Sequence, residues 1–178
     1  MVNLRQMFRP RPARLAGEAL YEAATRQARQ PDFYLSLGVP DTVEGRFELY
    51  SLHVVLLLRR LRGDGGGAAE VAQALFDTYV SALDNALREM GVGDLSVAKK
   101  MRKLGEAFYG RAKAYDTILA ARDHTELAAL IGRTVFADVA SDGCGKLADY
   151  VLAGADGLAA QPLEAVLEAR PRWPEVPV

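Results

Sequence analysis

Few side chains in this sequence belong to the types that carry out catalysis or bind metal ions. The histidines are His53 and His124, and Cys144 is the single cysteine. Their separation along the chain matches no zinc or di-iron motif, which would place ligands within a few residues of one another. A nucleophilic cysteine would also need a histidine arranged beside it. We therefore expect no metal centre, no cofactor and no enzymatic activity.

His53 stands within an apolar segment of a predicted helix. A single imidazole in such a place is more often a hydrogen-bonded core residue than a ligand or a base. We interpret His53 as a core histidine. The alternative is an enzyme in which His53 transfers protons together with Arg46, Glu48 or Tyr109. His124 lies near a predicted helix start and is expected on the surface.

Two glycine-rich segments resemble phosphate-binding loops only in part. Residues 63–67 follow a predicted helix, whereas such loops follow a strand and end in a lysine. Residues 143–146 end in lysine, but Ala140 stands at the position of the first glycine and Leu147 at that of the magnesium-binding hydroxyl. Neither segment is predicted to bind a nucleotide.

Positive charge is concentrated on one predicted helix in the middle of the chain. The segment 94–122 has a net charge of +4, although the whole chain has a net charge of −1. This face is either solvated or an electrostatic surface for anionic lipid headgroups, RNA or an acidic partner. Its basic residues are Lys99, Lys100, Arg102, Lys103, Arg111 and Lys113.

A second basic zone lies at the N-terminus, where residues 1–13 form a predicted basic arm. Arg5, Arg9 and Arg11 alternate there with apolar residues such as Leu4 and Phe8. This pattern is compatible with a short helix lying on a membrane surface.

Composition limits the chain to an ordinary soluble domain. It has 178 residues, of which 50% are hydrophobic and 25% charged, a balance that suits one globular domain with one core. The most apolar run, residues 49–58, is far shorter than the roughly 20 residues of a membrane-spanning helix. The lone cysteine and the lack of a signal-peptide pattern indicate the cytoplasm.

Apolar residues recur at intervals of three and four, and no segment keeps the period-two alternation of a strand. The sequence therefore predicts an all-α fold, a single-domain bundle of about six to seven helices. The segment 42–61 carries two apolar stripes, which indicates a helix buried between neighbours. The first four predicted helices cover about residues 14–29, 42–61, 68–90 and 94–121. A fifth starts at Asp123 or Thr125 and carries apolar residues as far as Val135, a sixth follows the loop 141–143 and carries apolar residues between 147 and 151, and a last short helix covers 162–168.

Polar residues and prolines mark the ends of these helices. Asp94 or Ser96 is expected to cap the helix that follows it. Leu15 and Met90 are expected to face the core because they lie in register with the apolar positions of their helices. Residues 171–178 contain three prolines and are expected to be extended or disordered.

Several short motifs without obvious local chemistry stand out between residues 33 and 115. In their order and spacing they resemble the ubiquinol-cytochrome c chaperone family over about residues 31–115. The motifs occupy residues 33–34, 38–42, 45–49, 52–53, 75–77, 87–94, 106–111 and 114–115.

The resemblance implies an assembly factor for the ubiquinol-cytochrome c reductase (bc1) complex, a chaperone that binds newly made cytochrome b. Since we find no membrane-spanning segment and no clear mitochondrial presequence in the sequence, we expect a bacterial member of the family that works in the cytoplasm, peripherally at the inner face of the cytoplasmic membrane. The ribosome or an anionic membrane surface are further contacts under this hypothesis, and DNA is not a partner. A second hypothesis is a binding protein for a quinone, lipid or haem-type ligand, with a cavity lined by Tyr50, His53, Phe108 and Tyr115.

We select ten polar or aromatic residues of the matched region as the partner-binding set. Each has a structural alternative: Asp41 can cap a helix, Arg46 and Glu48 can pair with Glu89 and Arg88, and Tyr109 can belong to the core. The set is Asp41, Arg46, Glu48, Arg88, Glu89, Asp94, Lys99, Lys103, Tyr109 and Arg111.

Overall fold

The computed structural model describes residues 12–63 and 65–177, and over these ranges the chain forms helices and no strands. This confirms the predicted all-α fold. The short α3 was not predicted, whereas residues 1–11, with most of the predicted basic arm, lie outside the described ranges. The helices are α2 (Pro12–Ala28), α3 (Pro31–Leu35), α4 (Val43–Leu61), α5 (Gly66–Glu89), α6 (Asp94–Ala121), α7 (His124–Thr134), α8 (Gly143–Ala160) and α9 (Leu163–Leu167).

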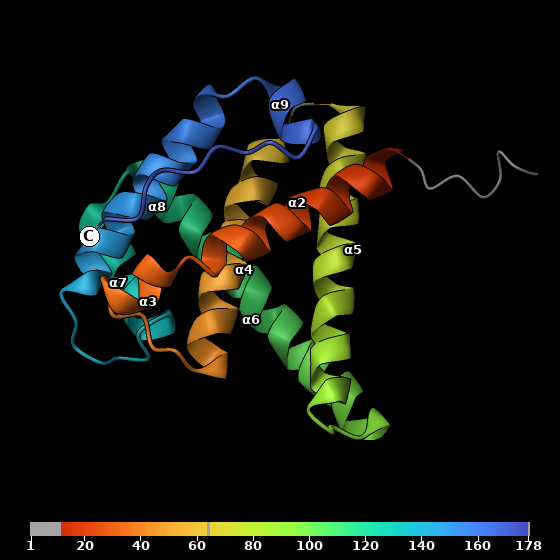
Figure 1. The fold of residues 1–178 in the computed structure, drawn as a ribbon, viewed down its shortest axis with the longest axis horizontal. Coiled ribbons are helices and arrows are strands. Elements are labelled where there is room, and N and C mark those ends of the chain that lie inside the picture. Colours follow the sequence, from red (N-terminus) through yellow and green to blue (C-terminus); the bar gives the residue numbers. More distant parts are fainter. Residues whose placement is uncertain (1–11, 64, 178) are drawn as a thin grey trace, which may run out of the picture.

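Helix α4 forms the centre of the molecule, as its two apolar stripes predicted. It contacts α2, α5, α6 and α8, and its residues from Leu49 to Leu57 are almost all buried. In Figure 1, α2 crosses in front of α4 and α5, while α6 passes behind them. Helices α5 and α6 form a long hairpin whose turn projects away from the rest of the bundle (Figure 1).

Helices α2 and α5 approach each other closely at a glycine. A Cβ atom on Gly17 would lie 2.6 Å from the Cβ of Ala74 and from the backbone nitrogen of Leu75. The face of α2 that carries Gly17 and Leu20 is therefore its core face. The prediction that Leu15 faces the core is wrong, because Leu15 lies about two residues, or some 200°, around the helix from Gly17 and is half exposed.

Two predictions at helix ends also need correction. Helix α5 ends at Glu89, so Met90 falls outside its apolar register and is largely exposed. Gly93 precedes α6 and Asp94 is its first residue, so neither Asp94 nor Ser96 is the N-cap. The carboxylate of Asp94 instead lies in the first turn, where it interacts favourably with the helix dipole.

A hydrogen-bonded chain of side chains crosses the core and confirms His53 as a core histidine. The side-chain amide of Gln27 donates to the hydroxyl of Tyr150 (3.0 Å), and Nε2 of His53 lies 2.9 Å from that hydroxyl. Nδ1 of His53 lies 2.7 Å from the carbonyl oxygen of Leu49 and donates to it. Burial lowers the pKa of His53 to about 4, so the imidazole is neutral near pH 7 and its Nε2 accepts from Tyr150.

The C-terminal segment folds back onto this core in an extended conformation. The Trp173 ring lies 5.0 Å from the His53 ring, centroid to centroid, in an edge-on arrangement. Gln161 bonds the backbone nitrogen and carbonyl oxygen of Arg172 (2.7 and 2.9 Å). Of the two predicted states of this segment, the extended one is therefore observed for residues 171–177. Within the described ranges no helix is both long enough and apolar enough to cross a membrane.

Candidate functional site

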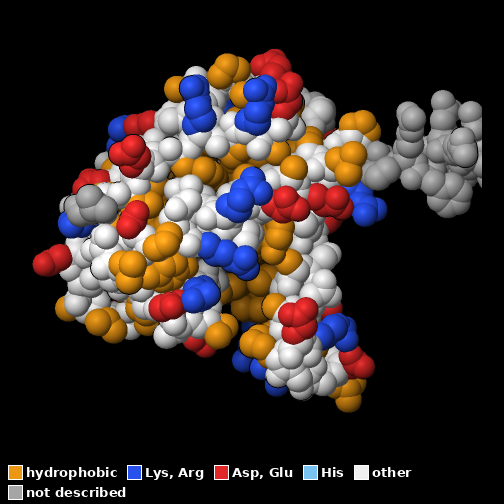
Figure 2. Space-filling model, viewed as in Figure 1, with side chains coloured by type: hydrophobic (Ala, Val, Ile, Leu, Met, Phe, Trp, Pro, Cys, Tyr) orange, Lys and Arg blue, Asp and Glu red, His pale blue; other side chains and the backbone are white. Residues whose placement is uncertain are grey.

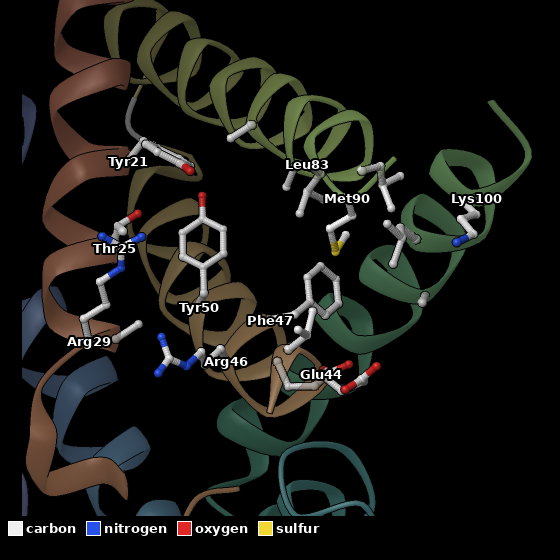
Figure 3. Close-up of a pocket in the computed structure, with 18 of the residues that line it drawn as sticks. Tyr21, Thr25, Arg29, Glu44, Arg46, Phe47, Tyr50, Leu83, Met90 and Lys100 are labelled. Carbon is white, nitrogen blue, oxygen red and sulfur yellow. The ribbon is translucent and has the colours of Figure 1, made fainter. Parts of the chain in front are cut away.

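A groove of about 670 Å³ lies between α2, α4, α5 and α6. Figure 3 shows Tyr21, Thr25 and Arg29 entering it from α2, Phe47 and Tyr50 from α4, Leu83 and Met90 from around the end of α5, and Lys100 from α6. In the space-filling view, hydrophobic side chains line a hollow between the body of the molecule and the end of the α5–α6 hairpin (Figure 2). The groove forms because α5 extends beyond α2. Helix α2 therefore does not cover the start of α4, the end of α5 or the start of α6 (Figure 1).

A nearly buried ion pair joins α4 and α6 at this groove. Nη2 of Arg111 lies 2.5 Å from Oε1 of Glu48, and the side chain of Glu48 is only 9% exposed. Burial of the carboxyl group raises the pKa of Glu48 to about 7, and the charge of Arg111 opposes this shift only in part. The contact of Glu48 with Arg111 is made through Nη2 alone.

The groove also contains polar atoms that have no partner. Nε and Nη1 of Arg111, the hydroxyl of Tyr50 and Oγ1 of Thr25 are buried and make no hydrogen bond within the described residues. All three residues border the groove. A buried donor without an acceptor costs about 1–3 kcal/mol, so a bound molecule that supplied acceptors would recover this energy.

Unpaired cations stand at the two ends of the groove. Arg29 and Lys100 border it from α2 and α6, and neither forms an ion pair with a described residue. Figure 3 shows them on opposite sides of the apolar stretch around Phe47. The groove thus combines an apolar wall with positively charged or donor groups at its ends and floor.

The predicted partner-binding set is distributed over three places. Arg46, Glu48 and Arg111 border the groove, and Asp41 is linked to it through its ion pair with Arg46. The others lie outside it. Arg88, Glu89 and Asp94 surround the α5–α6 turn, and Lys99, Lys103 and Tyr109 are exposed on α6.

The structural alternatives considered for six of these residues are wrong. Thr42, and not Asp41, caps α4, because its hydroxyl accepts a hydrogen bond from the backbone nitrogen of Gly45. Arg46 pairs with Asp41 and Glu48 with Arg111, so the proposed pairing of Arg46 and Glu48 with Glu89 and Arg88 does not form. Arg88 instead binds Asp84 and Asp94. Tyr109 is 63% exposed and is not a core residue.

Sequence reasoning missed Thr25, Arg29 and Met90 as residues of the groove. Thr25 and Arg29 lie on α2, in a segment without motifs, and no pattern pointed to them. The four residues proposed to line one cavity, Tyr50, His53, Phe108 and Tyr115, do not line a common pocket: His53 and Tyr115 are buried and border neither the groove nor the smaller pocket beside Tyr109. Phe108 borders a smaller pocket of about 380 Å³ beside Tyr109, and Tyr50 alone borders the groove.

The remaining reactive side chains lie apart from the groove. Burial raises the pKa of the Cys144 thiol, which lowers the fraction of reactive thiolate. His124 is exposed at the start of α7, as predicted, with Nε2 3.1 Å from a carboxylate oxygen of Asp149. No three His, Cys, Asp or Glu side chains of the described ranges are close enough together to hold a metal ion.

The titrations of Glu48 and His53 are expected to change the free energy of unfolding in opposite directions as the pH rises. Burial lowers the pKa of His53 from 6.5 to about 4, so stability is lost as the pH falls from 6.5 to 4, because only the unfolded chain gains a proton. The pKa of Glu48 is raised from 4.5 to about 7, so stability is lost as the pH rises from 4.5 to 7. Each effect amounts to about 3 kcal/mol over its range.

The two slopes largely cancel between pH 4.5 and 6.5. We therefore expect a nearly constant free energy of unfolding for the natural chain in this range, and a clear rise with pH for Glu48→Gln, measured by urea unfolding. His53→Phe, with a neutral aromatic side chain, is the matched variant and should show a fall with pH instead. Parallel profiles for Glu48→Gln and the natural chain would contradict the assignment of a raised pKa to Glu48.

Comparison with known proteins provides the remaining observation. Residues 35–173 match the family model described as ubiquinol-cytochrome C chaperone. The match therefore extends well beyond Tyr115, where the sequence motifs ended, into the C-terminal helices. The sequence-based resemblance to this family is confirmed.

Curated relatives are assembly factors of vertebrates. The mouse ubiquinol-cytochrome c reductase complex assembly factor 1 is 26% identical over 123 residues, which is 69% of this chain and 41% of the mouse protein. The corresponding protein of Xenopus laevis is 22% identical over 117 residues, 66% of this chain and 58% of its own length. The chain thus spans about two fifths to three fifths of the curated relatives it matches.

The fold also matches a solved structure over nearly its whole length. The crystal structure of the Cbp3 homolog from Brucella abortus superposes with a TM-score of 0.85 and 36% sequence identity. The match covers 93% of this chain and 92% of that one. The helical arrangement around the groove is therefore that of a bacterial relative.

Proposed function

The chain belongs to the ubiquinol-cytochrome c chaperone family, and on this premise we propose that it is an assembly factor for the bc1 complex that holds newly made cytochrome b in the groove between α2, α4, α5 and α6. The proposal places the protein in the cytoplasm, peripherally at the inner face of the cytoplasmic membrane. The family is one of chaperones and assembly factors and not a class of enzymes.

The observation that carries the proposal is the chemistry of the groove. Its wall is apolar, and its floor holds the buried donors of Arg111 that have no acceptor. A segment of a membrane subunit that has not yet reached its partners exposes apolar side chains together with unpaired backbone or carboxylate acceptors. Such a segment is complementary to both parts of the groove, in the manner of an amphipathic helix bound in a hydrophobic groove.

The rim of the groove favours a protein segment over a small ligand. Val43 and Met90 border the groove and are largely exposed, so the apolar surface continues outward beyond the hollow. Pockets for small molecules instead enclose most of the ligand surface. A quinone, lipid or haem-type ligand remains the alternative that the experiment distinguishes.

Deleting the gene is expected to lower the amount of cytochrome b in the membranes, because an unassembled membrane subunit without its chaperone aggregates or is degraded.

Arg111→Met, expressed in the deletion strain, should restore cytochrome b poorly, since loss of charge-assisted hydrogen bonds weakens binding about tenfold. Met90→Asp should do the same without removing a buried group. Arg133→Met on α7, an exposed residue outside the groove, should restore the normal level. Haem spectra of the membranes report the amount of cytochrome b.

The binding surface is tested separately by photo-crosslinking in the natural chain. A photoreactive residue at Ala86, which is exposed and borders the groove, should capture cytochrome b. The same residue at Ala159, exposed on α8 outside the groove, is the control. Normal cytochrome b after gene deletion would refute the assembly role. Capture from Ala159 but not Ala86 would refute the groove, and recovery of a small hydrophobic molecule with no protein would support the alternative.

A further inference from the structure

Helix α6 presents two different faces, and only one of them belongs to the groove. Lys100, Leu104 and Arg111 border the groove. The opposite side, which we call the α6 outer face, carries Leu95, Lys99, Arg102, Lys103, Tyr109 and Lys113, with the acidic Glu106 among them, at spacings that place them along one side of a helix. All six apolar and basic residues are exposed, although the ring of Tyr109 also contacts Phe76 of α5.

Positive charge on the α6 outer face is largely uncompensated. Lys99, Lys103 and Lys113 form no ion pair with a described residue. Arg102 lies 3.6 Å from Glu106, but both side chains are well exposed, and such a pair contributes little. The charge is therefore available to an anionic surface.

Apolar side chains accompany these cations. Leu95 is 95% exposed at the start of α6, which is unusual for so large an apolar residue, and it contributes nothing to the core. Tyr109 is 63% exposed; its ring lies 5.6 Å from that of Phe76, centroid to centroid. Leucine and tyrosine interleaved with lysines are typical of helices that lie in the headgroup region of a bilayer.

The position of the α6 outer face also suits a flat partner. Leu95 and Lys113 are about 27 Å apart along the helix, and the α5–α6 turn beside Leu95 projects from the bundle (Figure 1). A bilayer can contact such a projecting, elongated face without meeting the rest of the molecule first.

We propose that the α6 outer face docks on an anionic phospholipid bilayer, with the lysines on the headgroup phosphates and Leu95 inserted between headgroups. The groove, on the other side of the same helix, then faces away from the bilayer, about 10 Å from it across the width of α6. This proposal depends on the proposed function in one respect only, which is that the molecule entering the groove is cytochrome b. RNA and acidic proteins would use the same charges, but neither accounts for the exposed Leu95.

The test uses the purified full chain and sedimentation with vesicles of phosphatidylcholine, either alone or mixed with phosphatidylglycerol. We expect binding to the mixed vesicles only, weakened by salt. Lys99→Gln with Lys103→Gln should weaken this binding about 30-fold, since each charge near the surface contributes about 1 kcal/mol. Lys146→Gln with Arg133→Gln removes the same charge from α8 and α7, away from the projecting turn, and should leave binding unchanged.

A second pair of variants tests the insertion of Leu95. Leu95→Ser should weaken binding several-fold, whereas Leu35→Ser, at a residue that is 82% exposed on α3, should not. Equal binding to both kinds of vesicle, or equal loss in the two double variants, would overturn the proposal. Binding of RNA without binding of vesicles would also overturn it. Since vesicles contain no client, these results are independent of whether cytochrome b is lost in the deletion strain.

Discussion

Gly143→Ala is expected to lower the free energy of unfolding by about 3 kcal/mol, at the upper end of the range for overpacking a close contact. A Cβ atom at this position would lie 1.9 Å from the carbonyl oxygen of Leu37 and 3.0 Å from the ring of Phe136. The oxygen belongs to the backbone between α3 and α4, so it cannot move as a side chain would. The start of α8 must therefore shift away from that segment.

Gly157→Ala in the same helix is the matched control. Its Cβ would meet nothing within 4 Å, so we expect unchanged stability or a gain of up to about 1 kcal/mol from the better helix propensity of alanine. Urea unfolding followed by circular dichroism measures both variants. Equal stabilities would show that the contact between α8 and Leu37 is not tight in solution.

His53→Ala is expected to destabilise the fold by about 3–4 kcal/mol, the range for removing a buried aromatic side chain. The imidazole is fully buried, contacts the rings of Phe33 and Trp173, and accepts the hydrogen bond of Tyr150. Its loss leaves a cavity and removes one of the contacts that hold the C-terminal segment, the packing against Trp173. His124→Ala, at an exposed site, should change stability by less than about 0.5 kcal/mol.

This experiment also distinguishes a core histidine from a proton-transfer residue. In the structure His53 does not border the groove, so it is not placed to act together with Arg46 or Glu48 on a bound molecule. We therefore expect cytochrome b levels to follow the stability of His53 variants. A His53→Ala protein that stays folded at growth temperature but restores no cytochrome b would support the proton-transfer hypothesis instead.

The helices were predictable because their determinants are local. The apolar register of α4 and the glycines around the α5–α6 turn lie within a few residues of the features they determine, and the predicted limits of α4, α5 and α6 lie within about two residues of the observed ones. The position of Leu15 was predicted wrongly because the apolar pattern of α2 contains several alanines and does not show which side of the helix packs against another helix. The close approach at Gly17 decided that, and it depends on Ala74 of another helix.

The candidate site was predictable only in part. Glu48, Arg46 and Arg111 belong to motifs, and the structure brings them to one groove. Their partners were predicted wrongly, because Glu48 and Arg111 are far apart in sequence and only the crossing of α4 and α6 brings them together. Thr25 and Arg29 carried no signal, since α2 contributes to the groove through its position alone.

The sequence by itself determined the all-helical class, the family and a basic stretch in the middle of the chain, because periodicity, motifs and charge are properties of neighbouring residues. The tertiary structure decided which charges remain unpaired. Arg88 is neutralised across the α5–α6 turn, whereas Lys99 and Lys103 are left without a carboxylate on the exposed side of α6. It also decided that Arg111 meets Glu48 at the floor of a groove, since burial and pairing depend on contacts between helices distant in sequence.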